Sequence, residues 1–155
     1  MPRLWLVLFS LLFVLPSFAT ELSGKVVGIT DGDTFTLLLV DNSTVRIRLH
    51  GIDTPEKGQP FGENAKQYTS NLIFNKQVKV NQTDTDRYGR IVGIVTNPEN
   101  INVNEALLKA GMAWHYKRYD TNPNWAKMEE LAKASKIGLW KDSAPIPPWE
   151  WRNLK

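Results

Sequence analysis

Three strand-like stretches that follow one another closely place the strongest limit on how this chain can fold. In GKVVGITDGDTFTLLLVDNSTVRIRLHGID, residues 24–53, apolar and polar side chains alternate over much of the length, as in half-buried strands. Asp31-Gly32 and Asp41-Asn42-Ser43 carry the residue types that form tight turns between strands. The segment therefore predicts three consecutive strands joined by short turns.

Helical patterns follow this strand region at three places. The spacing of apolar residues predicts an amphipathic helix from Gly62 to about Phe74. Asn104 is a plausible N-cap for a second helix, which Gly111 would end. A third helix is expected to open at Asn122-Pro123 and to run to Gly138, because proline is well suited to the first helical turn.

Two further strands complete the pattern and indicate a fold class. KQVKVNQTD and RIVGIVT, residues 76–84 and 90–96, read as a fourth and a fifth strand joined at the corner DRYGR. Five short antiparallel strands that close on themselves, with a helix between the third and the fourth, describe an OB-type barrel. We therefore predict an α+β protein, mainly β, with a five-stranded OB-fold barrel and about three helices packed around it.

The N-terminus is predicted to be a secretory signal peptide covering residues 1–19. A short positive lead precedes LWLVLFSLLFVLP, an apolar run well below the ~20 residues of a membrane-spanning helix. Ser17 and Ala19 are small, so we expect cleavage after Ala19, with an uncleaved anchor as the alternative. The expected divisions are then a domain at residues 20–143 and a proline- and tryptophan-rich tail at 144–155 that lies extended. Because a signal peptide directs export, we expect a secreted or periplasmic protein without stable membrane association.

Composition narrows the possible chemistry. The 155 residues suffice for one domain, and 42% hydrophobic with 23% charged residues indicates a globular chain. The chain contains no cysteine, which excludes disulfides, thiol catalysis and zinc–thiolate sites. Two histidines are too few for a histidine-rich metal cluster. The net charge of +3 is compatible with a polyanionic partner but is common among unrelated proteins.

Carboxylates and arginines are expected to meet at one end of the barrel. Side chains alternate along a strand, so Arg46, Arg48 and His50 share the outer face of the third strand. In a three-strand meander, the turn carrying Asp33 lies at the same end as the exit of the third strand, which leads to Asp53. Clustered carboxylates repel one another unless a cation lies among them, and oxygen ligands favour calcium or magnesium.

The corner DRYGR adds Arg90 and the ring of Tyr88 to these groups. Taken alone, each motif has an ordinary reading, as a hairpin turn or a solvated strand arginine. Together, a cation, two arginines and a spare carboxylate such as Glu56 are what a phosphodiester hydrolase needs. The cation and guanidiniums would stabilise charge on phosphoryl oxygens, and the carboxylate would orient or deprotonate a water molecule.

DGDT, RLHGIDTPE and DRYGR, in this order and spacing, closely resemble the staphylococcal nuclease (thermonuclease) family. The likeness runs from about Gly24 to Trp140 and includes the later NVNEALLKAGMAW. The resemblance implies an OB-fold endonuclease that uses calcium to hydrolyse DNA and RNA with low sequence specificity. Such an enzyme cuts on the 5′-oxygen side of the phosphodiester and leaves 3′-phosphate ends.

The resemblance also implies metal ligands. By position, Asp33 and Asp53 match the calcium-binding carboxylates of the family, and the backbone carbonyl of Thr54 matches a further ligand. Asp31 matches an acidic residue that lies nearby without binding the metal directly.

Catalytic and substrate-binding roles carry over in the same way. Arg48 and Arg90 match two phosphate-binding arginines, and Glu56 matches the glutamate proposed as general base. Tyr88 matches a tyrosine close to the bound nucleotide. A second such tyrosine falls at Tyr116 or Tyr119, and the register leaves both open.

Further candidate residues and alternative functions also follow from the sequence. His50 is interpreted as a surface or packing residue, and Lys79, Lys117 and Arg118 line the substrate path or are plain solvated charges. The alternative function is a non-catalytic nucleic-acid-binding OB-fold module of the cell envelope, and a third is an envelope structural protein. A binding module would be expected to have lost part of the ionic set, and this chain keeps all of it. We expect a monomer with DNA and RNA as substrates.

Overall fold

The computed structural model describes residues 20–154. The predicted signal peptide, residues 1–19, lies outside the described residues. The elements in chain order are β1 (Glu21–Asp31), β2 (Thr34–Leu38), β3 (Thr44–Leu49), β4 (Ile52–Asp53), α1 (Gly62–Ile73), β5 (Gln77–Thr85), β6 (Ile91–Thr96), α2 (Val103–Lys109), β7 (Trp114–His115), α3 (Pro123–Ala134), the 3₁₀ helix η1 (Gly138–Lys141) and α4 (Pro148–Trp151).

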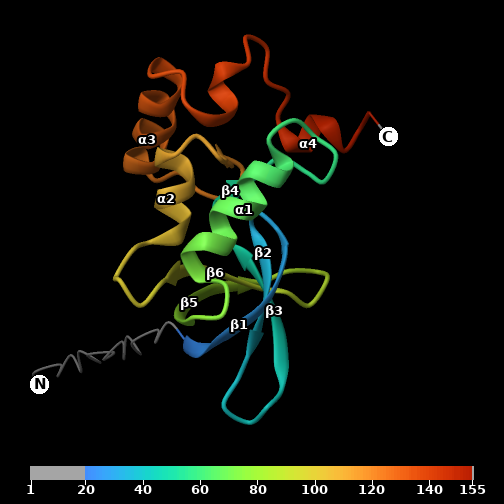
Figure 1. The fold of residues 1–155 in the computed structure, drawn as a ribbon, viewed down its shortest axis with the longest axis vertical. Coiled ribbons are helices and arrows are strands. Elements are labelled where there is room, and N and C mark those ends of the chain that lie inside the picture. The colour runs from blue at the N-terminus through green and yellow to red at the C-terminus, as the bar shows by residue number, and fades with distance from the viewer. Residues whose placement is uncertain (1–19, 155) are drawn as a thin grey trace, which may run out of the picture.

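Five strands form a closed barrel in the order β1-β2-β3-β6-β5, which confirms the predicted OB-type barrel (Figure 1). The expectation that all neighbouring strands are antiparallel is wrong. β3 and β6 pair in parallel, with Ile47 opposite Ile91, while the other four pairs are antiparallel. The reason is topological: strand direction cannot alternate around a ring with an odd number of strands, so one pair must be parallel.

The barrel interior is filled by the apolar side chains of alternate strand positions. On β3, Ile47 and Leu49 are buried, whereas Arg46 is exposed on the opposite face. The strands contribute the core residues Val26, Phe35, Leu37, Val78, Val80 and Val95. One contiguous core follows from this alternation, and it leaves the outer face of β3 free for charged side chains.

The second helix begins two residues earlier than predicted. Its N-cap is Asn102, whose side chain accepts a hydrogen bond from the backbone N–H of Glu105. Asn104 lies inside α2 and is fully buried. Its amide bonds the barrel backbone, accepting from Val95 N at 3.1 Å and donating to His50 O at 2.9 Å. Asn104 therefore joins helix to barrel, and the expected stop residue, Gly111, does lie just past the helix with φ +66°.

The C-terminal part of the chain also departs from expectation. Asn122 and Pro123 open α3 as predicted, but the helix ends at Ala134 rather than Gly138. Gly138 has φ +55°, and a Cβ there would lie 2.2 Å from the carbonyl oxygen of Gly111, so only glycine fits this contact. The tail is not extended throughout, because residues 148–151 form the short helix α4.

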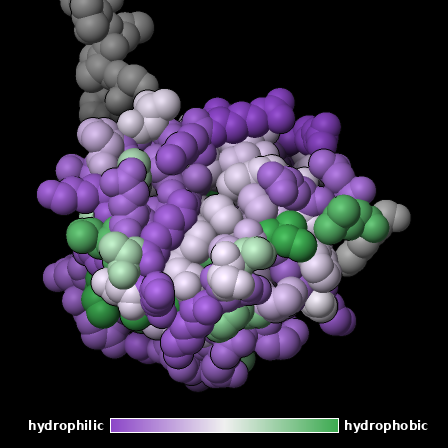
Figure 2. All heavy atoms as spheres, turned by 90° about the horizontal axis from the view of Figure 1, so that it is seen from above, coloured by the Kyte–Doolittle hydropathy of each residue, from purple (hydrophilic) through white to green (hydrophobic). Residues whose placement is uncertain are grey.

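The face seen from the α3 and α4 end is dominated by hydrophilic residues, with apolar residues in small separate patches (Figure 2). Within residues 20–154, no helix combines the length and the hydropathy that crossing a membrane requires.

Candidate active site

Three segments that are close in sequence meet at one end of the barrel. The β1–β2 turn carries Asp33, β3 carries Arg48, and β4 carries Asp53. The Arg48 guanidinium lies 2.5 Å from Asp33 Oδ2 and donates to Asp53 Oδ1 at 3.1 Å. All three side chains are largely shielded from solvent, since Arg48 is 14% exposed and the two carboxylates 8% or less. The convergence expected from the meander is therefore present.

The turn after β4 is fixed against the first hairpin. The backbone N–H of Thr54 donates to Asp33 Oδ2 at 2.9 Å. Gly32 makes this approach possible, because a Cβ at that position would lie 2.8 Å from both the Thr54 hydroxyl and the Ala65 side chain. The DGDT motif thus needs its glycine for packing against the site as well as for the turn.

The buried carboxylates have pKa values that reflect their crowding. Burial and the negative charge of Asp33 raise the pKa of Asp31 to about 7. Burial and Asp33 also raise the pKa of Asp53 to about 6, against the opposing effect of nearby guanidiniums. Burial opposes ionisation of Asp33 too, but Arg48 and hydrogen bonds from Asp31 and Thr54 lower its pKa below the ordinary value. The cluster therefore concentrates negative charge in a small, poorly solvated volume.

The corner between β5 and β6 contributes the second arginine. Arg90 Nε donates to Asp86 Oδ2 at 2.7 Å, and its Nη1 lies 3.4 Å from the Thr34 hydroxyl. That hydroxyl donates to Asp33 Oδ1 at 3.1 Å. Arg90 is thus connected to the acidic cluster through one side chain. Tyr88 projects from the same corner, two-thirds exposed, with the Arg90 guanidinium 5.6 Å from its ring centre.

Glu56 lies at the rim of the site and has a partner that sequence reasoning missed. Arg152, from the C-terminal tail, contacts Glu56 Oε1 at 2.5 Å and Asp53 Oδ2 at 2.8 Å. The turn at Glu56 is held by Gln59, whose Oε1 accepts from the Glu56 N–H at 2.9 Å. No local pattern in the sequence pointed to Arg152, because its acidic partners lie almost a hundred residues earlier.

The remaining candidates lie away from the carboxylates. His50 Nδ1 is 3.0 Å from the Thr83 hydroxyl and its Nε2 is 3.5 Å from Asp120, which agrees with a packing role. Of the two candidate tyrosines, Tyr119 is 61% exposed, whereas Tyr116 is half-buried beneath Trp149. The basic residues Lys79, Lys117 and Arg118 are all exposed.

The donor set suits a hard cation. Within the described part of the chain, no three Asp, Glu, His or Cys side chains are grouped as a ready metal centre. Asp33 and Asp53 are nevertheless buried oxygen donors, and Asp53 already binds two guanidiniums, those of Arg48 and Arg152. Buried, crowded carboxylates are stabilised by a nearby positive charge. Backbone carbonyls and water can complete the oxygen coordination shell of a cation bound to them. The residues therefore fit calcium or magnesium.

Comparison with known proteins gives a family-level match. Residues 46–142 match the family described as "Staphylococcal nuclease homologue". A protein of Escherichia coli named "Uncharacterized endonuclease" is 41% identical over 150 residues, covering 97% of this chain and 96% of that protein.

Two further relatives have similar coverage. "Protein ParB" of Escherichia coli is 43% identical over 147 residues, covering 88% of this chain and 82% of that protein. The "Micrococcal nuclease" of Shigella flexneri is 38% identical over 152 residues, covering 92% of this chain and 86% of the relative. These alignments include the segments that carry the acidic cluster and the arginine corner.

Proposed function

Because the chain belongs to the staphylococcal nuclease family and is an endonuclease-type hydrolase, we propose that it is a calcium-dependent nuclease that cuts both DNA and RNA. Cleavage has low sequence specificity and leaves 3′-phosphate ends. The observation that carries this proposal is the meeting of Asp33, Arg48 and Asp53 at one end of the barrel, with Glu56 at its rim.

In this proposal Asp33 and Asp53 would hold the metal, and the carbonyl of Thr54 would add a ligand. Calcium, when bound, stabilises negative charge on the phosphoryl oxygens and orients water. Arg48 contacts Asp33 and Asp53 in this structure, and with a cation on these carboxylates its planar guanidinium would be available to the phosphate. Low sequence specificity is expected, because these groups recognise the phosphate rather than the base.

The chemical step is hydrolysis of the P–O5′ bond. Glu56 accepts a proton from the attacking water as the water oxygen bonds to phosphorus. The P–O5′ bond breaks, the 5′-oxygen takes up a proton from solvent, and Glu56 then returns its proton to solvent. Arg90 shares the charge that develops on the phosphoryl oxygens, and Tyr88 contacts the nucleotide from the exposed corner. Preorganised donors of this kind each typically contribute on the order of 10²–10³ in rate.

The direct test uses purified protein from Thr20 to Lys155, incubated with DNA or RNA in calcium or in excess chelator. We expect cutting of both polymers in calcium and none in chelator, and zinc should not replace calcium because the donors are all oxygens. Glu56→Gln is the matched inactive control. Product ends that a polymerase extends only after phosphatase treatment identify 3′-phosphates. Undiminished cutting in chelator would disprove the metal roles of Asp33 and Asp53.

We also propose that residues 1–19 are a signal peptide, that residues 20–143 form the nuclease domain and that 144–155 are its tail. The mature protein is then secreted or periplasmic, monomeric and free of stable membrane association. The support is the short apolar run ending in Ser17 and Ala19. Intact mass of protein exported by a bacterial host should begin at Thr20, and a full-length chain recovered in membranes would contradict the proposal.

A further inference from the structure

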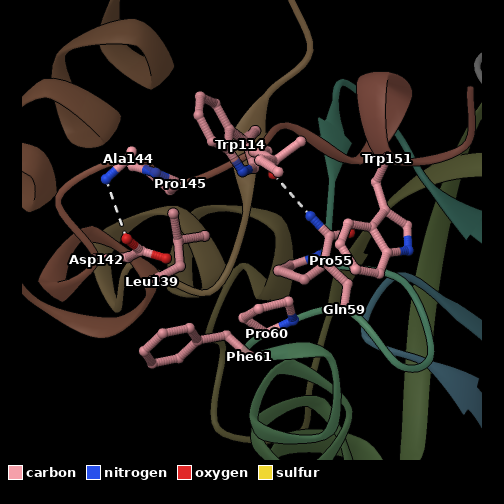
Figure 3. A pocket seen from close by; sticks show the side chains of 11 residues that line it. Pro55, Gln59, Pro60, Phe61, Trp114, Leu139, Asp142, Ala144, Pro145 and Trp151 are labelled. Carbon is pink, nitrogen blue, oxygen red and sulfur yellow. Dashed lines mark hydrogen bonds between the residues drawn. The ribbon is translucent and has the colours of Figure 1, made fainter. Parts of the chain in front are cut away.

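The C-terminal segment, residues 144–154, lies beyond the family match at 46–142 and yet packs against the active-site turn. Gln59, which fixes the turn at Glu56, donates from Nε2 to the carbonyl of Ile146 at 2.7 Å. Figure 3 shows the small cavity at this junction, where Trp151 of the tail lies beside Pro55 and Gln59 of the turn. The segment is therefore docked on the turn that carries Glu56.

Arg152 brings this segment into the acidic cluster. Its guanidinium donates to Asp53 Oδ2 at 2.8 Å and to Glu56 Oε1 at 2.5 Å. Asp53 is 1% exposed, and Arg152 is 42% exposed, so the arginine reaches from the surface onto a buried carboxylate. The oxygens it occupies belong to the proposed metal ligand and the proposed general base. A divalent cation and this guanidinium cannot both be fully bound there.

Trp149 covers one of the two candidate nucleotide-contacting tyrosines. Its ring stacks on Tyr116 with centroids 5.1 Å apart and planes 3° from parallel. It also meets Trp114 edge-on at 5.7 Å. Parallel stacking on an aromatic ring is how a nucleobase binds to such a residue. The tail thus covers one ring face of Tyr116, one of the two candidate nucleotide-contacting tyrosines, while Arg152 contacts Asp53 and Glu56.

We propose that the C-terminal segment is an intramolecular occupant of the active site, in which Arg152 competes with the metal for Asp53 and blocks Glu56, the proposed general base. The proposal rests on the calcium dependence put forward above. Metal binding requires Arg152 to leave Asp53, and release of the segment also frees Glu56 and uncovers Tyr116. The apparent metal affinity equals the affinity of the undocked protein multiplied by the fraction of molecules whose tail is undocked.

The test measures calcium binding directly, by isothermal titration calorimetry of metal-free protein from Thr20 to Lys155. Arg152→Gln should bind calcium about two- to fivefold more tightly than the wild type, because a partly exposed ion pair typically contributes about 1 kcal/mol or less. Arg46→Gln removes the same charge from the exposed face of β3 and should change the affinity less than about twofold. Thermal melts check that each variant is folded.

A second variant separates docking from simple charge removal. Trp149→Ala changes no charge but removes the ring contacts that dock the tail on Tyr116 and Trp114. It should therefore also tighten calcium binding. If Arg152→Gln binds calcium more tightly and Trp149→Ala does not, the change in calcium affinity comes from local electrostatics alone and the docking proposal is wrong. Unchanged calcium affinity in both variants would also overturn the proposal. If the wild type binds calcium and cuts nucleic acid, and both variants have the same calcium affinity as the wild type, then only the tail-docking proposal is wrong. A wild type that neither binds calcium nor cuts would overturn the proposed function, and the inference with it.

Discussion

Replacing Arg48 by lysine separates a specific phosphate contact from general attraction to nucleic acid. Arg46 and Arg48 lie on the same face of β3, two residues apart, so the same substitution can be made at both. Lysine keeps the positive charge but cannot make paired planar contacts. A general electrostatic effect would make the two variants equally mild. A specific contact would make Arg48→Lys much worse.

The magnitude follows from the contacts of each side chain. Arg48 is 14% exposed and joins Asp33 to Asp53, whereas Arg46 is exposed. Losing one preorganised donor to a transition-state oxygen should lower kcat by about 10²–10³ for Arg48→Lys. The KM should change less, because the contact strengthens as charge develops. Lysine would retain one of the two carboxylate contacts, so a stability loss of about 1–2 kcal/mol is expected.

The assay is steady-state cleavage of a defined oligonucleotide at saturating calcium, with urea unfolding of the same preparations. Arg46→Lys should keep kcat within about twofold of the wild type and its stability within about 0.5 kcal/mol. A folded Arg48→Lys protein with near-normal kcat would refute the phosphate contact. A loss of equal size in Arg46→Lys would also refute it, because the effect would then belong to the charge of the strand rather than to one guanidinium.

Three other substitutions test the framework around the site. Asn104→Ala leaves Val95 N and His50 O without their buried partner, so urea unfolding should show a loss of about 2–4 kcal/mol. Gly32→Ala would drive a methyl group into Thr54 and should lower calcium affinity and stability together, which unchanged titrations would contradict. Burial opposes ionisation of Asp120, but a hydrogen bond with His115 lowers its pKa below the ordinary value near 4. Asp120→Asn should therefore cost about 1–2 kcal/mol at pH 7, and this difference should shrink as pH falls below about 4; a gap that stays constant with pH would contradict the assignment.

Local patterns were enough to predict the meander and the meeting of the acidic groups. The alternation in residues 24–53 defines strand faces, and the turn at Asp31-Gly32 defines which ends coincide. Asp33, Arg48 and Asp53 therefore lie together as expected. Their contacts depend on strand direction and side-chain alternation, and a few residues of sequence are enough to predict both.

Features that depend on long-range packing were missed. Asn102 and Asn104 are both good N-caps by residue type, and only the buried hydrogen bonds to the barrel show that Asn104 lies inside the helix. The parallel pairing of β3 with β6 follows from the number of strands in the ring rather than from any motif. The contact of Arg152 with the active site could not be predicted, because nothing in the sequence around a tail arginine indicates which distant carboxylate it contacts.

The sequence distances within the site imply an order of assembly during folding. Arg48 and Asp53 are 5 residues apart, Asp33 and Thr54 are 21 apart, and Arg90 meets Thr34 across 56 residues. Arg152 reaches Asp53 across 99 residues. Because closing longer loops costs more chain entropy, the acidic cluster should form early, the arginine corner should follow with barrel closure, and the tail should dock last. On this order, the carboxylates assemble before the C-terminal segment covers them.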